Sequence, residues 1–195
     1  MPRVGLLFLL AFLYSVMWHG SVTNISVFVL QLLEAHPPEA GADTGAAASW
    51  IGAAATVMAL STMVALPLWG RVIDRVGPAR VLVFAAAATV ITHLPLLVLQ
   101  TPLQLVLARV AFGLTAAGMQ TAIFQLLRMH APPGMDARAL SYATAFQFLA
   151  MGVAPFFAGL VGPALGLRAY FAITTALMLG GLGLWLRGGR RGASA

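Results

Sequence analysis

The chain has 195 residues, of which 61% are hydrophobic and 8% are charged, and its formal net charge is +6. A soluble globular domain is about 45–50% apolar and about 25% charged, so this composition excludes a soluble enzyme, a disordered tail and a nucleic-acid module. Basic loops on the cytoplasmic side of a membrane explain the positive charge. Cysteine is absent, which excludes a disulfide framework and a thiolate metal site. The composition therefore predicts an integral membrane protein.

Apolar runs separated by polar turns predict an all-α protein with six transmembrane helices, since about 20 apolar residues cross a bilayer. The first run is longer than the apolar region of a secretory signal, about 7–15 residues, so we expect it to remain as a helix. Trp50 and Trp69 flank the second run, as interfacial tryptophans do. The predicted spans are 4–33, 50–69, 81–99, 103–127, 139–165 and 169–186, which together form one domain at 1–186, followed by a basic tail at 187–195.

The arginines predict the orientation, because cytoplasmic loops carry an excess of basic residues. With the N-terminus inside, nine of the eleven basic residues are cytoplasmic, Arg168 is outside and Arg109 lies within the fourth span. The nine are Arg3, Arg71, Arg75, Arg80, Arg128, Arg138, Arg187, Arg190 and Arg191. We therefore expect a multi-pass protein of the inner membrane with both termini in the cytoplasm.

The segment between the second and third spans carries a motif of glycine, aspartate and arginine, Gly70-x-x-x-Asp74-Arg75-x-Gly77, followed by Arg80. Gly70 and Gly77 are expected to allow tight backbone turns. Asp74 is expected at the positive end of a neighbouring helix, and the two arginines at the anionic leaflet. The motif and its position resemble the signature loop of the major facilitator superfamily, although the two residues after Gly77 depart from the basic residues usual there.

Two weaker motifs follow in the same order as in that family. Arg109 and Gly113 are similar to its fourth-helix arginine motif, with Phe112 in place of the usual glutamine. Pro155 and Gly159 resemble the Gly-Pro-x-x-Gly-Gly motif of proton-coupled drug exporters, with alanines in place of two glycines. The resemblance implies that Gly113, Pro155 and Gly159 serve helix packing.

Residues 100–104 and 138–146 look most like the C-terminal half of bacterial multidrug exporters, which are drug–proton antiporters of twelve helices. The resemblance implies a six-helix half that moves drug-like solutes by alternating access, together with a second copy or a separate N-terminal-like half. In that family the aspartate of the signature loop acts as a latch that holds the two halves together on the cytoplasmic side. The resemblance implies that in a homodimer Asp74 would meet the fifth-helix N-terminus of the other copy, near Ala137 and Arg138. A remnant that does not transport, or a helical membrane scaffold, is the alternative.

Polar side chains inside the predicted spans are the candidates for a substrate or proton pathway. They are His19, Thr23, Asn24, Arg109, Gln120 and Gln147. His19 and Thr23 share one helix face, as do Arg109 and Gln120. An arginine at a helix centre costs about 2.5–3.5 kcal/mol of insertion free energy, so a charge there is expected to have a function. Arg109 is therefore the strongest single candidate for a pathway residue. The alternative is that its side chain extends (snorkels) to the outer headgroups. We expect the face bearing His19, Arg109 and Gln120 to meet the second half.

The acidic residues lie in loops or at helix ends, where none is placed to carry a proton through the membrane. They are Glu34, Glu39, Asp43, Asp74 and Asp136. Proton coupling would therefore depend on His19 or on another half. The membrane-embedded Gly-x-Ser-Gly of a rhomboid-like protease and the His-Glu-x-x-His of a metalloprotease are both missing, so we expect no enzyme, no metal and no cofactor.

Overall fold

The computed structural model describes residues 2–35 and 44–191, and within them the chain is helical with short connections. Glu39 and Asp43 lie outside the described residues. The helices are α1 (Pro2–Thr23), α2 (Ile25–Ala35), α3 (Thr44–Val76), α4 (Pro78–His93), α5 (Pro102–His130), α6 (Asp136–Leu165) and α7 (Leu167–Arg191), with a 3-10 turn η1 at Leu94–Leu97. Six of them are long and apolar enough to cross a membrane, which confirms the predicted fold class.

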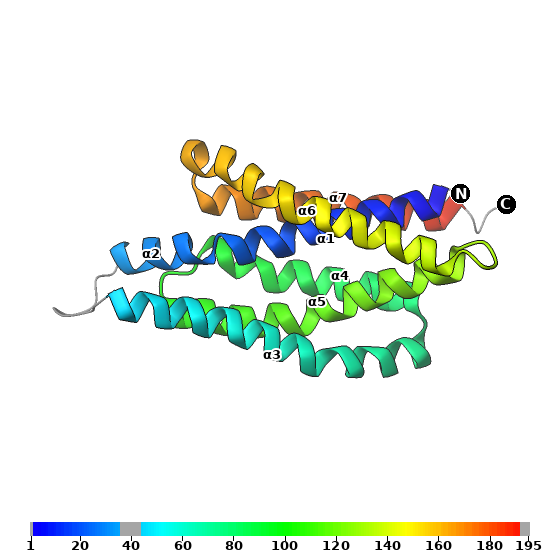
Figure 1. The fold of residues 1–195 in the computed structure, drawn as a ribbon, viewed down its shortest axis with the longest axis horizontal. Helices are drawn as coiled ribbons and strands as arrows, with labels where there is room; N and C mark the ends of the chain where they lie inside the picture. The colour runs from blue at the N-terminus through cyan, green and yellow to red at the C-terminus, as the bar shows by residue number, and fades with distance from the viewer. Residues whose placement is uncertain (1, 36–43, 192–195) are drawn as a thin grey trace.

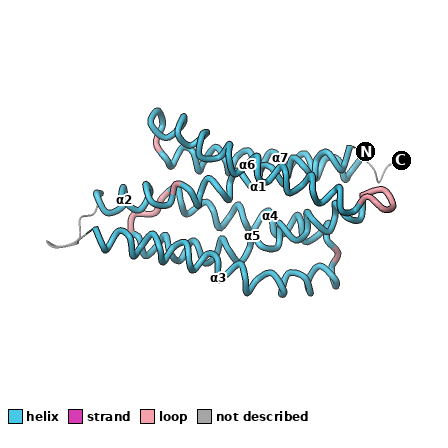
Figure 2. The backbone as a smooth tube through the Cα atoms, in the orientation of Figure 1, coloured by secondary structure: helices cyan, strands magenta, loops and turns pink. Residues whose placement is uncertain are grey.

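The helices lie in two layers of three (Figure 1). α1, α6 and α7 pack together in one layer, and α3, α4 and α5 form the other. The N- and C-terminal ends lie at the same end of the bundle, as six crossings require, and the short connection between α5 and α6 lies there too (Figure 2).

The first predicted span, 4–33, is two helices rather than one. The helical pattern is interrupted at Asn24, whose side-chain Nδ2 donates to the Gly20 carbonyl at 2.7 Å. The backbone remains nearly continuous, because Phe28 N donates to the Asn24 carbonyl at 3.0 Å. An asparagine side chain that bonds the backbone one turn earlier competes with the regular ladder, and this offers a local reason for the break.

The signature segment is mostly helix, which corrects the prediction of a turn over residues 70–80. α3 continues through Gly70 and Asp74 to Val76, and only Gly77 stands between it and α4. Gly77 has φ +90°, a conformation that favours glycine, whereas Gly70 lies inside the helix and needs no such freedom. Pro78 then begins α4, where its missing N–H costs nothing.

Trp69 lies within α3 and packs against α5 rather than marking the end of a span. Its indole Nε1 donates to the Leu114 carbonyl at 2.7 Å. A Cβ on Gly118 would lie 2.4 Å from the Trp69 ring, so this glycine makes room for the indole. The hydropathy signal ended at Trp69 because polar residues begin there, but the hydrogen-bonded helix continues.

The later boundaries follow local chemistry. The third predicted span, 81–99, is not one continuous α-helix, because α4 ends at His93 and Pro95 lies in the 3-10 turn. Thr101 and Gln104 form a capping box that starts α5. The predicted tail is partly helical, since α7 continues to Arg191.

Glycines bring helices within each layer close together. The Tyr170 side chain on α7 fills the space above Gly20 on α1, where a Cβ would lie 1.6 Å from the phenol oxygen. A Cβ on Gly113 of α5 would lie 2.1 Å from the Ser61 hydroxyl of α3. Contacts this close give helices in a membrane the van der Waals packing that replaces the hydrophobic effect.

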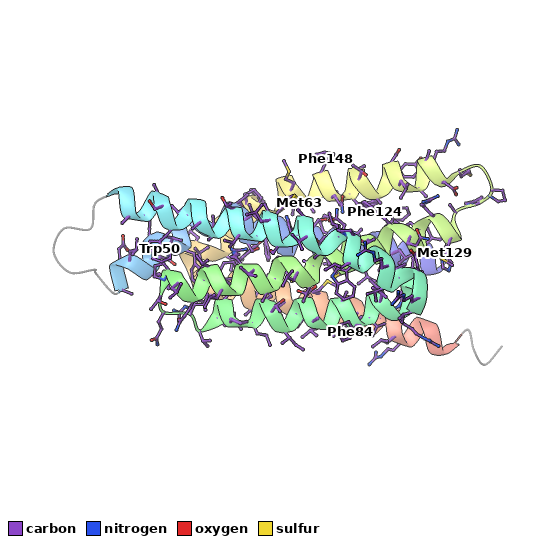
Figure 3. The ribbon with its side chains drawn as sticks, turned by 90° about the horizontal axis from the view of Figure 1, so that it is seen from below. Trp50, Met63, Phe84, Phe124, Met129 and Phe148 are labelled. Atoms are coloured by element: carbon purple, nitrogen blue, oxygen red, sulfur yellow. The ribbon has the colours of Figure 1, made fainter. Side chains whose placement is uncertain are left out.

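Helices α3 and α6 are the least buried of the six, with 17% of each span buried inside the bundle. Met63 on α3 is 61% exposed and Phe148 on α6 is 65% exposed (Figure 3). Such surfaces face lipid or another membrane subunit.

Candidate functional site

An open pocket of about 280 Å³ lies between α1, α5 and α6. It brings together three of the predicted pathway residues, His19, Gln120 and Gln147. The complete lining consists of Tyr14, Ser15, Trp18, His19, Gln120, Thr144, Gln147, Phe148 and Met151. We refer to this lining as the central pocket.

The central pocket lies near the middle of the membrane-spanning helices. Gln120 is ten residues from the end of α5 at His130, and Gln147 is eleven residues from the start of α6 at Asp136. At 1.5 Å per residue these positions are about 15–17 Å from that end of the bundle, which is about half of a 30 Å hydrocarbon core.

His19, Gln120 and Gln147 are partly exposed in the central pocket and are available to a ligand, whereas Ser15 is 1% exposed. Among the described residues, the side chains of Ser15, His19, Gln120 and Gln147 make no hydrogen bond to another protein group, although Thr144 donates to the Leu140 carbonyl. Trp18 and Phe148 supply accessible aromatic surface, and the buried Tyr14 ring packs against Trp18 with the centroids 5.9 Å apart. The pocket thus combines unpaired neutral polar groups with aromatic rings.

Arg109 does not face the central pocket, which corrects its prediction as a pathway residue and also excludes snorkelling. Its side chain is 1% exposed and crosses from α5 to α1. Nη1 donates to Ser21 Oγ at 2.7 Å, and Nη2 donates to the Ser21 carbonyl. Met58 Sδ lies 3.7 Å from Nη1. Arg109 therefore links the two layers of helices.

The Arg109 contact also explains the helix break next to it. The Ser21 carbonyl is the acceptor that Ile25 N would use in a continuous helix, and the helical pattern is interrupted between them at Asn24. A side chain that takes a carbonyl out of the i to i−4 ladder is a known cause of a helix bend. The guanidinium thus gains an acceptor that the interruption leaves free.

His93 is a buried polar residue that is not among the predicted pathway residues. It is 1% exposed, and both ring nitrogens lack a hydrogen-bond partner within the described part of the chain. Its ring packs against Phe112 at 5.2 Å and Phe171 at 5.7 Å between centroids. Its role here is aromatic packing between α4, α5 and α7.

The remaining predicted pathway residues lie off the central pocket. Thr23 Oγ1 donates to the His19 carbonyl at 2.9 Å, and Asn24 bonds the Gly20 carbonyl. Both are therefore engaged with the backbone of α1, at the point where this helix is interrupted.

The three residues predicted for helix packing behave differently. Gly113 lies against α3, as described above, and so serves packing inside the chain. Pro155 and Gly159 are exposed on α6, and no atom lies within 4 Å of a Cβ built on Gly159. The buried stripe of α6 consists of alanines instead: Ala143, Ala150, Ala154 and Ala158.

The charged residues of the signature segment are exposed at the end of the bundle that holds both termini. Asp74 and Arg75 occupy the last turns of α3, and Arg80 the first turn of α4. Ala137 and Arg138, at the start of α6, are exposed at the same end. Asp74 is therefore accessible to a second chain.

Curated relatives of the chain carry the name multidrug resistance protein MdtG. The protein from Yersinia enterocolitica is 29% identical over 128 residues, which cover 66% of this chain and 31% of the relative. The protein from Salmonella dublin is 26% identical over 151 residues, covering 77% and 37%. The chain thus spans about a third of the length of these relatives.

The fold is similar to that of solved transporter structures. A crystal structure of the peptide transporter POT in complex with sulfate superposes with a TM-score of 0.74 at 16% identity, over 95% of this chain and 37% of that chain. The bundle therefore corresponds to a six-helix part of a longer transporter fold. The family model of the Major Facilitator Superfamily matches residues 5–195. The chain, a multi-pass membrane protein with six spanning helices, belongs to the Major Facilitator Superfamily.

Proposed function

We propose that this chain is one half of a transporter that moves drug-like solutes across the membrane by alternating access. The observation that carries the proposal is the central pocket, where unpaired polar groups lie at mid-membrane. Polar side chains in a bilayer are costly and mark substrate or ion paths. Transporters built from six-helix repeats bind their substrates near the midplane between the repeats. The name of the relatives, multidrug resistance protein, favours efflux of drug-like solutes.

The second half is supplied by another copy of this chain or by a separate six-helix chain. The exposed apolar faces of α3 and α6 are the surfaces available for it. Two copies inserted in the same orientation are related by a two-fold axis along the membrane normal, as the halves of full-length members are. In that arrangement Asp74 of one copy latches onto the start of α6 of the other, near Ala137 and Arg138.

The orientation follows from the exposed arginines. Arg71, Arg75, Arg80, Arg138 and Arg187 lie at the end of the bundle with both termini. Arg168 lies at the opposite end, where it donates to the Leu99 carbonyl at 2.7 Å. By the positive-inside rule, this distribution supports a cytoplasmic location for the end with the termini, as expected for a protein of the inner membrane.

Asp74→Asn tests the latch. We expect this variant to lose efflux of a fluorescent dye from reconstituted vesicles while expression, helix content and melting temperature are kept. Glu34→Gln is the control, because Glu34 is an exposed carboxylate on α2, away from the proposed latch. Full efflux by Asp74→Asn contradicts the latch. If no pairing of the chain moves any solute, the remnant or scaffold alternative holds.

His19 provides the test of proton coupling by this chain. It supplies the one imidazole of the central pocket. If His19 carries the proton, His19→Gln makes solute flux independent of an imposed pH gradient while solute binding persists. Gradient-driven flux in His19→Gln assigns the proton to the other half.

A further inference from the structure

The lining of the central pocket is uncharged apart from any charge on His19. No carboxylate and no guanidinium is among its nine residues. Arg109 shares a face of α5 with Gln120, but its guanidinium is bonded to Ser21 in the core of the bundle and does not line the pocket. The wall that this chain contributes therefore offers a cation no opposite charge.

Two carboxamides dominate the polar side of the central pocket. Gln120 on α5 and Gln147 on α6 each carry two N–H donors and one carbonyl acceptor, and neither is bonded within the described chain. The Ser15 hydroxyl adds one more donor and acceptor. A ligand with an amide or hydroxyl group offers an acceptor for the glutamine N–H groups and a donor for the glutamine carbonyls. A quaternary ammonium group offers neither a donor nor an acceptor.

The aromatic side of the central pocket suits a flat ring. The Tyr14 and Trp18 rings lie 5.9 Å apart, and Phe148 is 65% exposed on the facing helix. Aromatic rings pair in offset or edge-to-face arrangements at centroid separations of about 4.5–7 Å. A volume of about 280 Å³ lies at the small end of ligand sites, which favours a single ring with a short polar substituent.

We propose that this wall binds uncharged solutes in which an aromatic ring is joined to an amide or hydroxyl group, and that it discriminates against their cationic counterparts. A cation would gain a contact with the face of Trp18. It would also lose hydration free energy, and no carboxylate in the pocket lining compensates for that loss. The inference rests on the proposed function for the role of the central pocket as the substrate site, and it assigns that site a substrate class.

Equilibrium dialysis of the purified full chain in phosphatidylcholine nanodiscs tests the inference. The probes are radiolabelled acetanilide, a neutral aryl amide, and radiolabelled phenyltrimethylammonium, a cation with the same ring. Empty nanodiscs measure partition into lipid, which is subtracted. We expect saturable acetanilide binding at least about tenfold tighter than that of the cation, because hydrogen bonds to the unpaired, half-buried amides of Gln120 and Gln147 add to ring stacking.

Gln147→Leu locates the binding. It is expected to weaken acetanilide binding about three- to tenfold, the loss of one or two neutral hydrogen bonds, and to leave binding of the cation unchanged. Gln125→Leu is the matched control, since Gln125 lies on α5 but outside the pocket lining. Equal effects of both variants would assign acetanilide to another surface and overturn the inference.

The remaining outcomes separate the inference from the proposed function. Equal or tighter binding of phenyltrimethylammonium overturns the inference, and so does the absence of saturable acetanilide binding. Selective acetanilide binding by a chain that supports no flux in any pairing with a second half leaves the inference standing and contradicts the transporter proposal. Flux that selects the cation supports the transporter proposal and overturns the inference about the substrate class.

Discussion

Replacing Arg109 by methionine and Ser21 by alanine, singly and together, measures how strongly one buried guanidinium ties α5 to α1. Hydrogen bonds to charged groups contribute about 1.5–3 kcal/mol, whereas neutral bonds between membrane helices average about 0.6 kcal/mol. Ser21→Ala removes the hydroxyl that accepts from Arg109 Nη1 at 2.7 Å. We expect it to lower the free energy of unfolding by about 2–3 kcal/mol in the otherwise natural chain.

In the Arg109→Met background the same Ser21→Ala change removes only a bond within α1, to the Trp18 carbonyl at 3.0 Å. The expected cost there is below about 1 kcal/mol, so the coupling energy between the two sites is about 1.5–2 kcal/mol. The assay is equilibrium unfolding in mixed micelles with increasing dodecyl sulfate, followed by tryptophan fluorescence and by circular dichroism.

Thr89→Ala is the control for the double-mutant cycle. Thr89 is buried, and its hydroxyl donates to the Ala85 carbonyl of its own helix at 2.7 Å. Its removal should cost the same with and without Arg109. If Ser21→Ala also costs the same in both backgrounds, the reasoning that Arg109 links α5 to α1 is refuted.

Two further predictions concern glycines, each compared with a second glycine of the chain that has neither the close contact nor the positive φ. Gly20→Ala drives a methyl group into the Tyr170 ring and should destabilise the chain by about 1–3 kcal/mol, whereas Gly159→Ala, where nothing lies within 4 Å, should be neutral or stabilising in a thermal melt. Gly77→Ala should cost about 1–2 kcal/mol for its φ of +90°, with no steric clash, while Gly70→Ala inside α3 should stabilise by about 0.5–1 kcal/mol. Equal melting temperatures within either pair would contradict the backbone or packing assigned here.

The number of spanning helices could be predicted from the sequence because long apolar runs are a strong signal. Helical spacing also grouped polar residues on single helices, such as Arg109 and Gln120 on α5. These features depend on local patterns and on composition. The meeting of His19, Gln120 and Gln147 at one pocket depends on how α1, α5 and α6 pack, which spacing within one helix does not give.

The position of Arg109 could not be predicted in the same way. Arg109 and Gln120 share a face of α5, but a helix of 29 residues meets different neighbours along its length. Near Gln120 that face borders the central pocket, and near Arg109 it packs against α1 and α3. The break at Asn24 escaped prediction for a related reason, since it depends on a guanidinium 88 positions away from Ser21.

The fit of Tyr170 over Gly20 has a consequence for how the chain is made. The two residues are 150 positions apart, so at about 5–20 residues per second the ribosome adds the tyrosine about 8–30 seconds after the glycine. The surface of α1 at Gly20 therefore lacks its contact with Tyr170 until the five later spans have been synthesised. Arg109 is synthesised earlier, so its guanidinium is available to Ser21 before α7 exists. Of these two contacts to α1, synthesis allows the one from Arg109 first and the one from Tyr170 later.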